Sequence, residues 1–171
     1  VGSADAASFR ILGPVVASDL SSDGSVIVGT LRVLPAPDEA IRWTAEDGVV
    51  GLGTLSSLTP NSGAAAISAD GSVIVGNASG PSAPTEAFIW TQSSGMMSLA
   101  STFGNPTESF AAGISGDGST IVGSAYSSSF SGAFRWTAET GIVGLGDLPG
   151  GEISTLVTDI SFDGSVIAGT G

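Results

Sequence analysis

The sequence predicts an all-β protein, a β-propeller-type array of four-stranded antiparallel blades. Three observations predict this fold class. The motif Ser-x-Asp-Gly-Ser recurs at spacings of 47, 47 and 46 residues, with its aspartate at Asp23, Asp70, Asp117 and Asp163. A tryptophan follows 20, 20 and 19 residues after the first three aspartates, at Trp43, Trp90 and Trp136. Short apolar runs rich in β-branched residues alternate with turns rich in glycine and serine, as in strands joined by tight turns.

The second repeat illustrates how one blade is expected to form. Asp70-Gly71 lies between two apolar runs and indicates a hairpin turn, because glycine readily adopts the positive φ that such a turn needs. About 47 residues are enough for four short strands, which is the size of a propeller blade. The expected elements are, in order, strands at 64–68 and 73–76, a loop at 77–85, a strand at 86–91, a turn at 92–95 and a strand at 96–99.

The repeat predicts a single repeat domain over residues 1–171, with three complete units, 14–60, 61–107 and 108–153, and a partial unit, 154–171. Residues 9–13 resemble a leading strand without its blade. One leading strand, twelve blade strands and two trailing strands leave strand edges open, and open edges tend to pair with other strands. We therefore expect a partner at these edges, either another copy of the chain or repeats that it lacks. A small self-closed four-blade ring is the alternative.

Composition restricts the partners and the chemistry. The chain has 16 acidic residues, four arginines and no lysine, for a net charge of −12. Such a surface argues against nucleic acid and against anionic membranes, because both need a positive surface. No apolar run approaches the roughly 20 residues of a membrane span. The absence of histidine and cysteine excludes thiol and imidazole nucleophiles and the usual zinc ligands.

Each candidate site has a simpler structural interpretation, which we favour. The four turn aspartates suggest Ca²⁺ ligands, but they lack the dense oxygen-ligand spacing of a calcium loop. The three tryptophans suggest a sugar-binding ladder, but their equivalent places in apolar strands predict a mostly buried core between blades. The arginines at Arg42 and Arg135 are expected to pair with nearby glutamates, and Asp38/Glu39 to be solvated acids. We therefore predict no catalytic, cofactor-binding or metal-binding residues, no cofactor, and folding without a metal.

Residues 39–55 and 132–151 resemble the HAF family of bacterial extracellular repeats. They read Glu-Ala-Ile-Arg-Trp-Thr-Ala-Glu-Asp-Gly-Val-Val-Gly-Leu-Gly-Thr-Leu and Gly-Ala-Phe-Arg-Trp-Thr-Ala-Glu-Thr-Gly-Ile-Val-Gly-Leu-Gly-Asp-Leu-Pro-Gly-Gly. The resemblance covers nearly the whole chain through its Trp, Gly-Leu-Gly and Asp-Gly-Ser motifs. The His-Ala-Phe triplet that names the family reads Glu-Ala-Ile, Glu-Ala-Phe and Gly-Ala-Phe here, without the histidine. The resemblance implies a secreted, extracellular or cell-surface location and transfers no catalytic residue.

Three functions remain open from the sequence. The first is a non-enzymatic extracellular or cell-surface scaffold for adhesion or assembly, including oligomers and filaments. The second is a module that binds surface glycans, proteins or another ligand through the loops of one face. The third is a carboxylate-based glycan-active enzyme. A large complementary contact between chains favours the first, an exposed aromatic platform the second, and two or three acids facing one pocket the third.

Overall fold

The computed structural model describes residues 13–99, 107–128, 130–146 and 156–170, and all regular elements in these ranges are β-strands. They form three four-stranded antiparallel sheets and one two-stranded hairpin, each ordered as in the chain. We call the three sheets blades 1, 2 and 3. Blade 1 contains β1 (Val15–Leu20), β2 (Val26–Leu31), β3 (Glu39–Thr44) and β4 (Gly48–Gly51). Blade 2 contains β5 (Asn61–Ile67), β6 (Val73–Gly80), β7 (Ala83–Thr91) and β8 (Gly95–Ser98). Blade 3 contains β9 (Glu108–Ile114), β10 (Thr120–Tyr126), β11 (Ser131–Thr137) and β12 (Gly141–Gly144), and the terminal hairpin contains β13 (Leu156–Ile160) and β14 (Ile167–Thr170).

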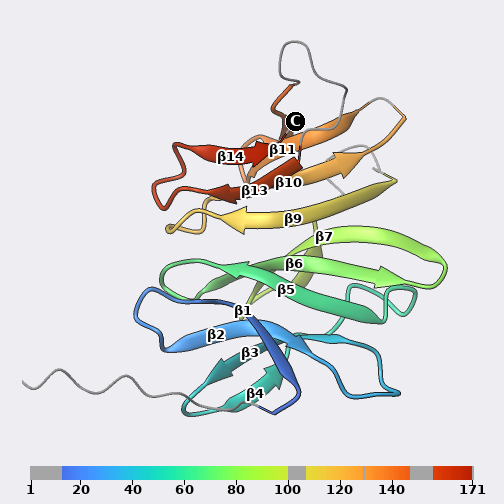
Figure 1. Cartoon of the computed structure of the whole chain (residues 1–171), viewed down its shortest axis with the longest axis vertical. Coiled ribbons are helices and arrows are strands. Elements are labelled where there is room, and N and C mark those ends of the chain that lie inside the picture. The colour runs from blue at the N-terminus through green and yellow to red at the C-terminus, as the bar shows by residue number, and fades with distance from the viewer. Residues whose placement is uncertain (1–12, 100–106, 129, 147–155, 171) are drawn as a thin grey trace, which may run out of the picture.

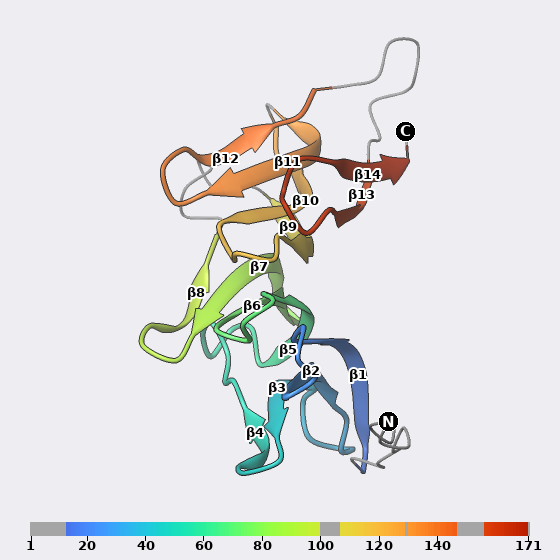
Figure 2. The ribbon, with the colours of Figure 1, turned by 90° about the vertical axis from the view of Figure 1, so that its left-hand side faces the viewer.

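The three blades follow one another in chain order along the long axis of the molecule, and the terminal hairpin lies beside blade 3 (Figures 1 and 2). The first strands of consecutive units, β1, β5, β9 and β13, lie next to one another and form the inner side of the array. The predicted leading strand at 9–13 lies outside the described residues except for Gly13, which is in a bend. No helix in the described part of the chain is long and apolar enough to cross a membrane.

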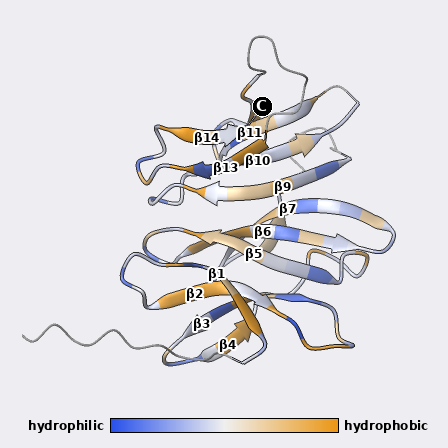
Figure 3. Ribbon diagram, viewed as in Figure 1, coloured by the Kyte–Doolittle hydropathy of each residue, from blue (hydrophilic) through white to orange (hydrophobic). Residues whose placement is uncertain are grey.

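The core lies between the blades. Each blade has one face toward the preceding unit and one toward the following unit, and apolar side chains of both faces meet in three clusters. The first joins blade 1 (Val26, Val28) to blade 2 (Ile74, Phe88), the second joins blade 2 (Val75, Ala87) to blade 3 (Ile121, Phe134), and the third joins blade 3 (Val122, Ala133) to the terminal hairpin (Val157, Ile160). Figure 3 shows the hydrophobic colour concentrated along strands such as β2, while the loops are mostly pale or blue. Burial between neighbouring repeats is the driving force expected of a repeat array.

The three tryptophans occupy equivalent places and none of them is exposed, so the expectation that they are mostly buried is confirmed. Each pairs with an isoleucine of the second strand, at Ile27, Ile74 and Ile121, on the face toward the preceding unit. Trp90 packs against the cluster between blades 1 and 2, and Trp136 against the cluster between blades 2 and 3. The placement between blades is therefore confirmed for these two. Their position near the end of the third strand leaves part of each indole ring in solvent.

Two local features differ from the sequence-based expectation. The predicted loop at 77–85 is mostly strand, because β6 and β7 extend to a two-residue turn at 81–82. Pro84 is tolerated because it lies where the register is irregular, between the Gly80–Ala83 and Ala78–Glu86 pairs, so its missing N–H interrupts no regular ladder. In addition, each inner strand has one bulged residue at the same repeat position, namely Ser18, Ala65, Ala112 and Thr158.

Candidate functional site

The four Asp-Gly turns are structurally equivalent, as their spacing predicts. Each turn glycine has φ between 69° and 74°. In blade 2, Asp70 Oδ1 accepts hydrogen bonds from Ser68 Oγ at 2.7 Å, Ser72 N–H at 3.0 Å and Ser72 Oγ at 2.8 Å. Ser68 Oγ also accepts the N–H of Val73 at 3.0 Å, so one hydroxyl links the turn to the start of β6. The same bonds recur around Asp23, Asp117 and Asp163.

These hydrogen bonds stabilise the charged form of each turn aspartate. The Ser21 hydroxyl, followed by the backbone and side chain of Ser25, lowers the pKa of Asp23 from 3.8 to about 2. The Ser161 hydroxyl and then Ser165 lower the pKa of Asp163 to about 2. The pKa values of Asp70 and Asp117 are lowered by the same kind of bonds, first from Ser68 and Ser115. The turn aspartates are thus ionised acceptors that hold their own hairpins.

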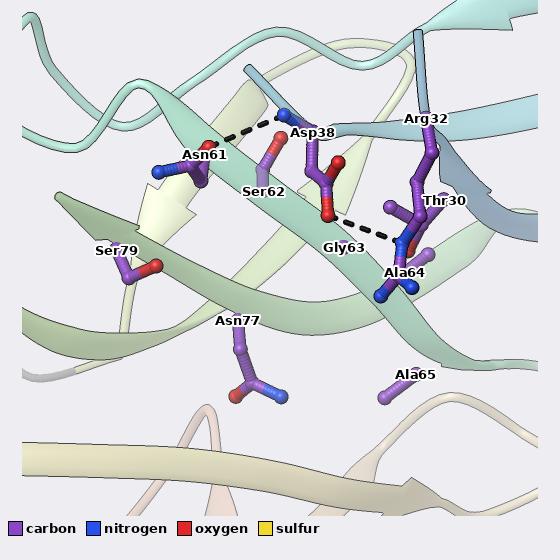
Figure 4. A pocket seen from close by; sticks show the side chains of 10 residues that line it. All are labelled: Thr30, Arg32, Asp38, Asn61, Ser62, Gly63, Ala64, Ala65, Asn77 and Ser79. Carbon is purple, nitrogen blue, oxygen red and sulfur yellow. Dashed lines mark hydrogen bonds and ion pairs between the residues drawn. The ribbon is translucent and has the colours of Figure 1, made fainter. Parts of the chain in front are cut away.

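An open polar pocket of about 290 Å³ lies between blades 1 and 2 (Figure 4). Its residues lie at the opposite end of the strands from the Asp-Gly turns. Its charged members are Arg32 and Asp38, joined by an ion pair of 3.1 Å between Nε and Oδ2. The remaining lining comes from β2, β5, β6 and the bulge in β5, and consists of Thr30, Asn61, Ser62, Gly63, Ala64, Ala65, Asn77 and Ser79. The pocket therefore offers a cation, an anion, amides and hydroxyls to a polar ligand.

Several of the pocket residues also hold neighbouring blades together. Asn61 Oδ1 accepts the N–H of Asp38 at 3.2 Å. Ser62 Oγ accepts the N–H of Ala40 at 3.0 Å and donates to the carbonyl of Gly53 at 2.8 Å. At the next boundary, Asn77 Oδ1 accepts the N–H of Ala111 at 2.8 Å. The pocket walls are thus positioned by hydrogen bonds between blades. Arg32 is the most exposed of the lining residues, with 62% of its side chain accessible to solvent.

Of the charged candidate residues from the sequence, only Asp38 lines this pocket, whereas Glu39, Arg42 and Arg135 lie elsewhere. Glu39 lies beside Gly51 of β4, so the Asp38/Glu39 pair does not face one site. Arg42 pairs with Asp47 at 3.3 Å, and Arg135 donates to Thr120 Oγ1 at 3.1 Å. The expected glutamate partners of these arginines are therefore wrong, because an aspartate in the adjoining turn and a threonine on the neighbouring strand are nearer.

Trp43 and Arg42 line a second open cavity, of about 410 Å³, together with the turn residues of blade 1. A third cavity, of about 220 Å³, lies where the inner strands end, and it is lined by residues of all four units, including Leu20, Ile67, Ile114 and Ile160. Within the described ranges, no group of three or more acidic residues is placed to hold a metal ion. Folding without a metal stays a prediction.

At the end of the inner strands, backbone hydrogen bonds connect all four units in one ladder. Ser22 N–H donates to the Ala69 carbonyl at 2.9 Å, and Ala69 N–H donates to the Gly116 carbonyl at 2.9 Å. Gly116 N–H donates to the Phe162 carbonyl at 2.8 Å. Sequence reasoning does not reveal this ladder. The four positions, each directly before a turn aspartate, carry different side chains because the bonds use only the backbone.

Comparisons with known proteins support the fold. No protein-family model and no curated protein matches the chain. Among solved structures, TolB from Acinetobacter baumannii is similar, with a TM-score of 0.66 and 15% sequence identity. The match covers 92% of this chain but only 38% of the TolB chain, so this chain spans less than two fifths of that protein's length. At this identity the likeness shows the fold alone, and with it the predicted β-propeller-type array of antiparallel blades is confirmed.

Proposed function

We propose that this chain is a non-enzymatic, extracellular or cell-surface scaffold for adhesion or assembly. The observation that carries the proposal is the use of its recurring polar residues. The turn aspartate and the serine two residues before it are the most regular polar groups of the sequence, and they bond to each other and to their own hairpin. The Ser62 and Ser109 hydroxyls also have a structural role, because each accepts a backbone N–H of the neighbouring blade. Polar groups that stabilise every repeat are what an extended scaffold requires.

Membership of the HAF family, inferred from residues 39–55 and 132–151, is part of this proposal, and so is the location outside the cell. The composition fits such a location. A net charge of −12 spread over a surface of serine, threonine and glycine favours solubility at high exposure. It also gives the module a negative field that repels nucleic acid and anionic lipid.

The cellular location of the protein and an assay for polysaccharide cleavage test the proposal together. Antibodies against the purified chain are used on the medium, the envelope and the cytoplasm of the source organism, with and without protease treatment of intact cells. We expect the antigen in the medium or in a protease-sensitive form on the cells, and labelled protein added to intact cells to remain bound to them. A cytoplasmic antigen that protease does not reach overturns the location. Release of new reducing ends from a polysaccharide panel overturns the non-enzymatic assignment.

A second candidate function is the binding of a polar ligand such as a glycan in the pocket between blades 1 and 2. The observation that favours it is the pair of charged side chains, Arg32 and Asp38, beside amides and hydroxyls on adjacent strands (Figure 4). A few well-placed polar groups in a concave site are typical of ligand recognition. Aromatic side chains are absent from its described lining, so the binding predicted is weak and dominated by hydrogen bonds.

The test is a glycan array probed with labelled protein, followed by calorimetry on any glycan bound. Arg32→Ala removes the exposed cation of the pocket and is expected to weaken binding about tenfold. Arg42→Ala is the matched control, because it removes an ion-paired arginine from the separate cavity beside Trp43. Equal binding by both variants, or no bound glycan, rejects this second function without affecting the first.

A further inference from the structure

The two ends of the array expose apolar residues whose equivalents at the internal boundaries are buried or half-buried. At the first end, Leu20 on β1 is 58% exposed, whereas the residue at the same repeat position, Ile67, is 6% exposed. The other equivalents, Ile114 and Ile160, are also buried. Val49 on β4 is likewise exposed, although its equivalent Ile142 is buried in the cluster between blades 2 and 3. This surface, with Leu20 and Val49 on it, is the face that blades 2 and 3 turn toward a preceding unit. We call it the leading face.

At the other end, the terminal hairpin exposes the face that blades 1, 2 and 3 turn toward a following unit, which we call the trailing face. Val166 is 62% exposed, whereas its equivalent Val26 is 5% exposed. Val26 is covered by the turn of the next blade, because a Cβ built at Gly71 would lie 2.8 Å from Val26 Cγ2. Val73 meets Gly118 in the same way. The trailing face thus lacks the Asp-Gly turn that covers its counterparts.

The backbone ladder ends at the same two faces. Within the described residues it runs from Ser22 to Phe162, and each N–H donates to the carbonyl of the next unit. At one end of the described ladder, the Ser22 carbonyl accepts no ladder bond. At the other end, the Phe162 N–H donates none. Phe162 itself is largely exposed. The trailing face therefore offers a donor and an apolar patch, and the leading face offers an acceptor, an Asp-Gly turn and a second apolar patch.

We propose that the trailing face of one molecule docks on the leading face of a second copy, head to tail. The argument is continuity with the boundaries within the chain, since the same type of contact is made three times between consecutive units. In the docked pair, Val166 packs against the turn at Gly24 of the second copy, and Phe162 N–H donates to its Ser22 carbonyl. The contact is heterologous, so repeated docking gives a ring or a filament. This inference rests on the assembly form of the proposed function.

A pair of aspartates sets the strength of the junction. In blade 1, Asp19 Oδ2 accepts the N–H of Ile67 of the following blade at 3.0 Å. Asp159 occupies the same repeat position in the terminal hairpin, and its Oδ1 accepts its own Ile160 N–H at 2.8 Å. A Cβ at Gly113, the equivalent position in blade 3, would lie 3.4 Å from Asp159 Oδ1. Head-to-tail docking therefore brings Asp159 beside Asp19 of the second copy. No boundary within the described chain opposes two carboxylates at this position, so the junction is weaker than the internal ones.

Association of the purified full chain is measured by sedimentation velocity and light scattering at micromolar concentrations and about 150 mM salt. We expect concentration-dependent association that weakens about tenfold or more in Val166→Asp, because a charge is then buried against an apolar surface. Val143→Asp is the matched control, since Val143 is an exposed valine on β12, away from both end faces.

Asp159→Asn is expected to tighten association about two- to fivefold by removing the like-charge contact while keeping an acceptor. Glu139→Gln makes the same change of net charge in an exposed turn and is expected to have no effect.

A disulfide trap distinguishes a second copy from closure within one chain. Gly113 and Ile160 are neighbours across the last internal boundary, with a Cβ at Gly113 lying 3.3 Å from Ile160 Cγ2. The corresponding pair at the junction is Asp159 and Leu20. A mixture of Asp159→Cys and Leu20→Cys, oxidised with oxidised glutathione, is expected to form a mixed dimer faster than Leu20→Cys mixed with Glu139→Cys.

Two results overturn the proposal. One is a wild type and an Asp159→Asn variant that are both monomeric at all concentrations. The other is a double variant, Leu20→Cys with Asp159→Cys, that forms only a disulfide within one chain, because the two faces then meet in the same molecule. Either result leaves the location and the surface binding of the proposed function untouched, since those are measured separately.

Discussion

Gly71 lies against Val26 of the preceding blade so closely that no side chain fits between them. A Cβ at Gly71 would be 2.8 Å from Val26 Cγ2, and Gly71 has a φ of 74°. This position therefore combines two requirements that only glycine meets together, a left-handed backbone and a contact between blades. The Asp-Gly turn is thus both a hairpin turn and the cap over the apolar patch of its neighbour.

Gly71→Ala is predicted to destabilise the protein by about 2–4 kcal/mol, because the strained backbone adds to a displaced Val26. Gly48→Ala separates the two causes. Gly48 also has a positive φ, of 70°, but a Cβ at this position would meet nothing within 4 Å, so only the backbone cost of about 1–2 kcal/mol is expected. Urea unfolding of both variants gives the difference. Equal losses in the two variants contradict the contact between blades.

Ser68→Ala is predicted to destabilise blade 2 by about 1–3 kcal/mol, because the Val73 N–H loses its partner beside the buried Ser68 and the exposed Asp70 carboxylate loses one of its donors. Ser161→Ala removes the same bonds from the terminal hairpin, where the serine is only half-buried. Water can replace the lost partner there, so a smaller loss is expected. Thermal unfolding of the two variants checks the order, and a larger loss in Ser161→Ala contradicts it.

The turn aspartates predict the acid limit of stability. Their folded pKa values lie below the ordinary value of 3.8, and those of Asp23 and Asp163 are about 2. A lowered folded pKa contributes stability that is fully present above the unfolded value and is lost as the pH falls through the folded one. The melting temperature is therefore expected to be insensitive to these groups above about pH 4 and to fall between pH 4 and pH 2. Asp163→Asn is expected to flatten this fall. An unchanged slope indicates that the acid transition arises from other carboxylates.

The turns and the blade order can be predicted from sequence because their causes are local. An Asp-Gly pair with a serine on each side contains the whole hydrogen-bond network of the turn, and the period repeats it. The ladder through Ser22, Ala69 and Gly116 cannot be predicted, because a backbone bond leaves no mark on the side chain. The pocket at Arg32 and Asp38 escapes prediction for a related reason. Its walls come from two blades, and the packing of the blades decides which strand residues of blade 2 face the loop of blade 1 that carries Arg32 and Asp38.

The tryptophans are mostly buried, as predicted, but a place in an apolar strand does not fix the exact depth of burial. Trp90 stands near the end of β7, where it packs against the cluster between blades 1 and 2 while part of its ring stays in solvent. Trp90→Ala is therefore predicted to cost about 2–3 kcal/mol of folding stability, below the roughly 3–5 kcal/mol of a fully buried aromatic residue.

Trp43 is the internal comparison. It holds the same repeat position on the leading face and lines an open cavity of about 410 Å³. Trp43→Ala is accordingly expected to cost less in dilute solution, measured by urea unfolding of the monomer. If head-to-tail docking covers the leading face, the loss in Trp43→Ala grows with protein concentration, whereas the loss in Trp90→Ala does not.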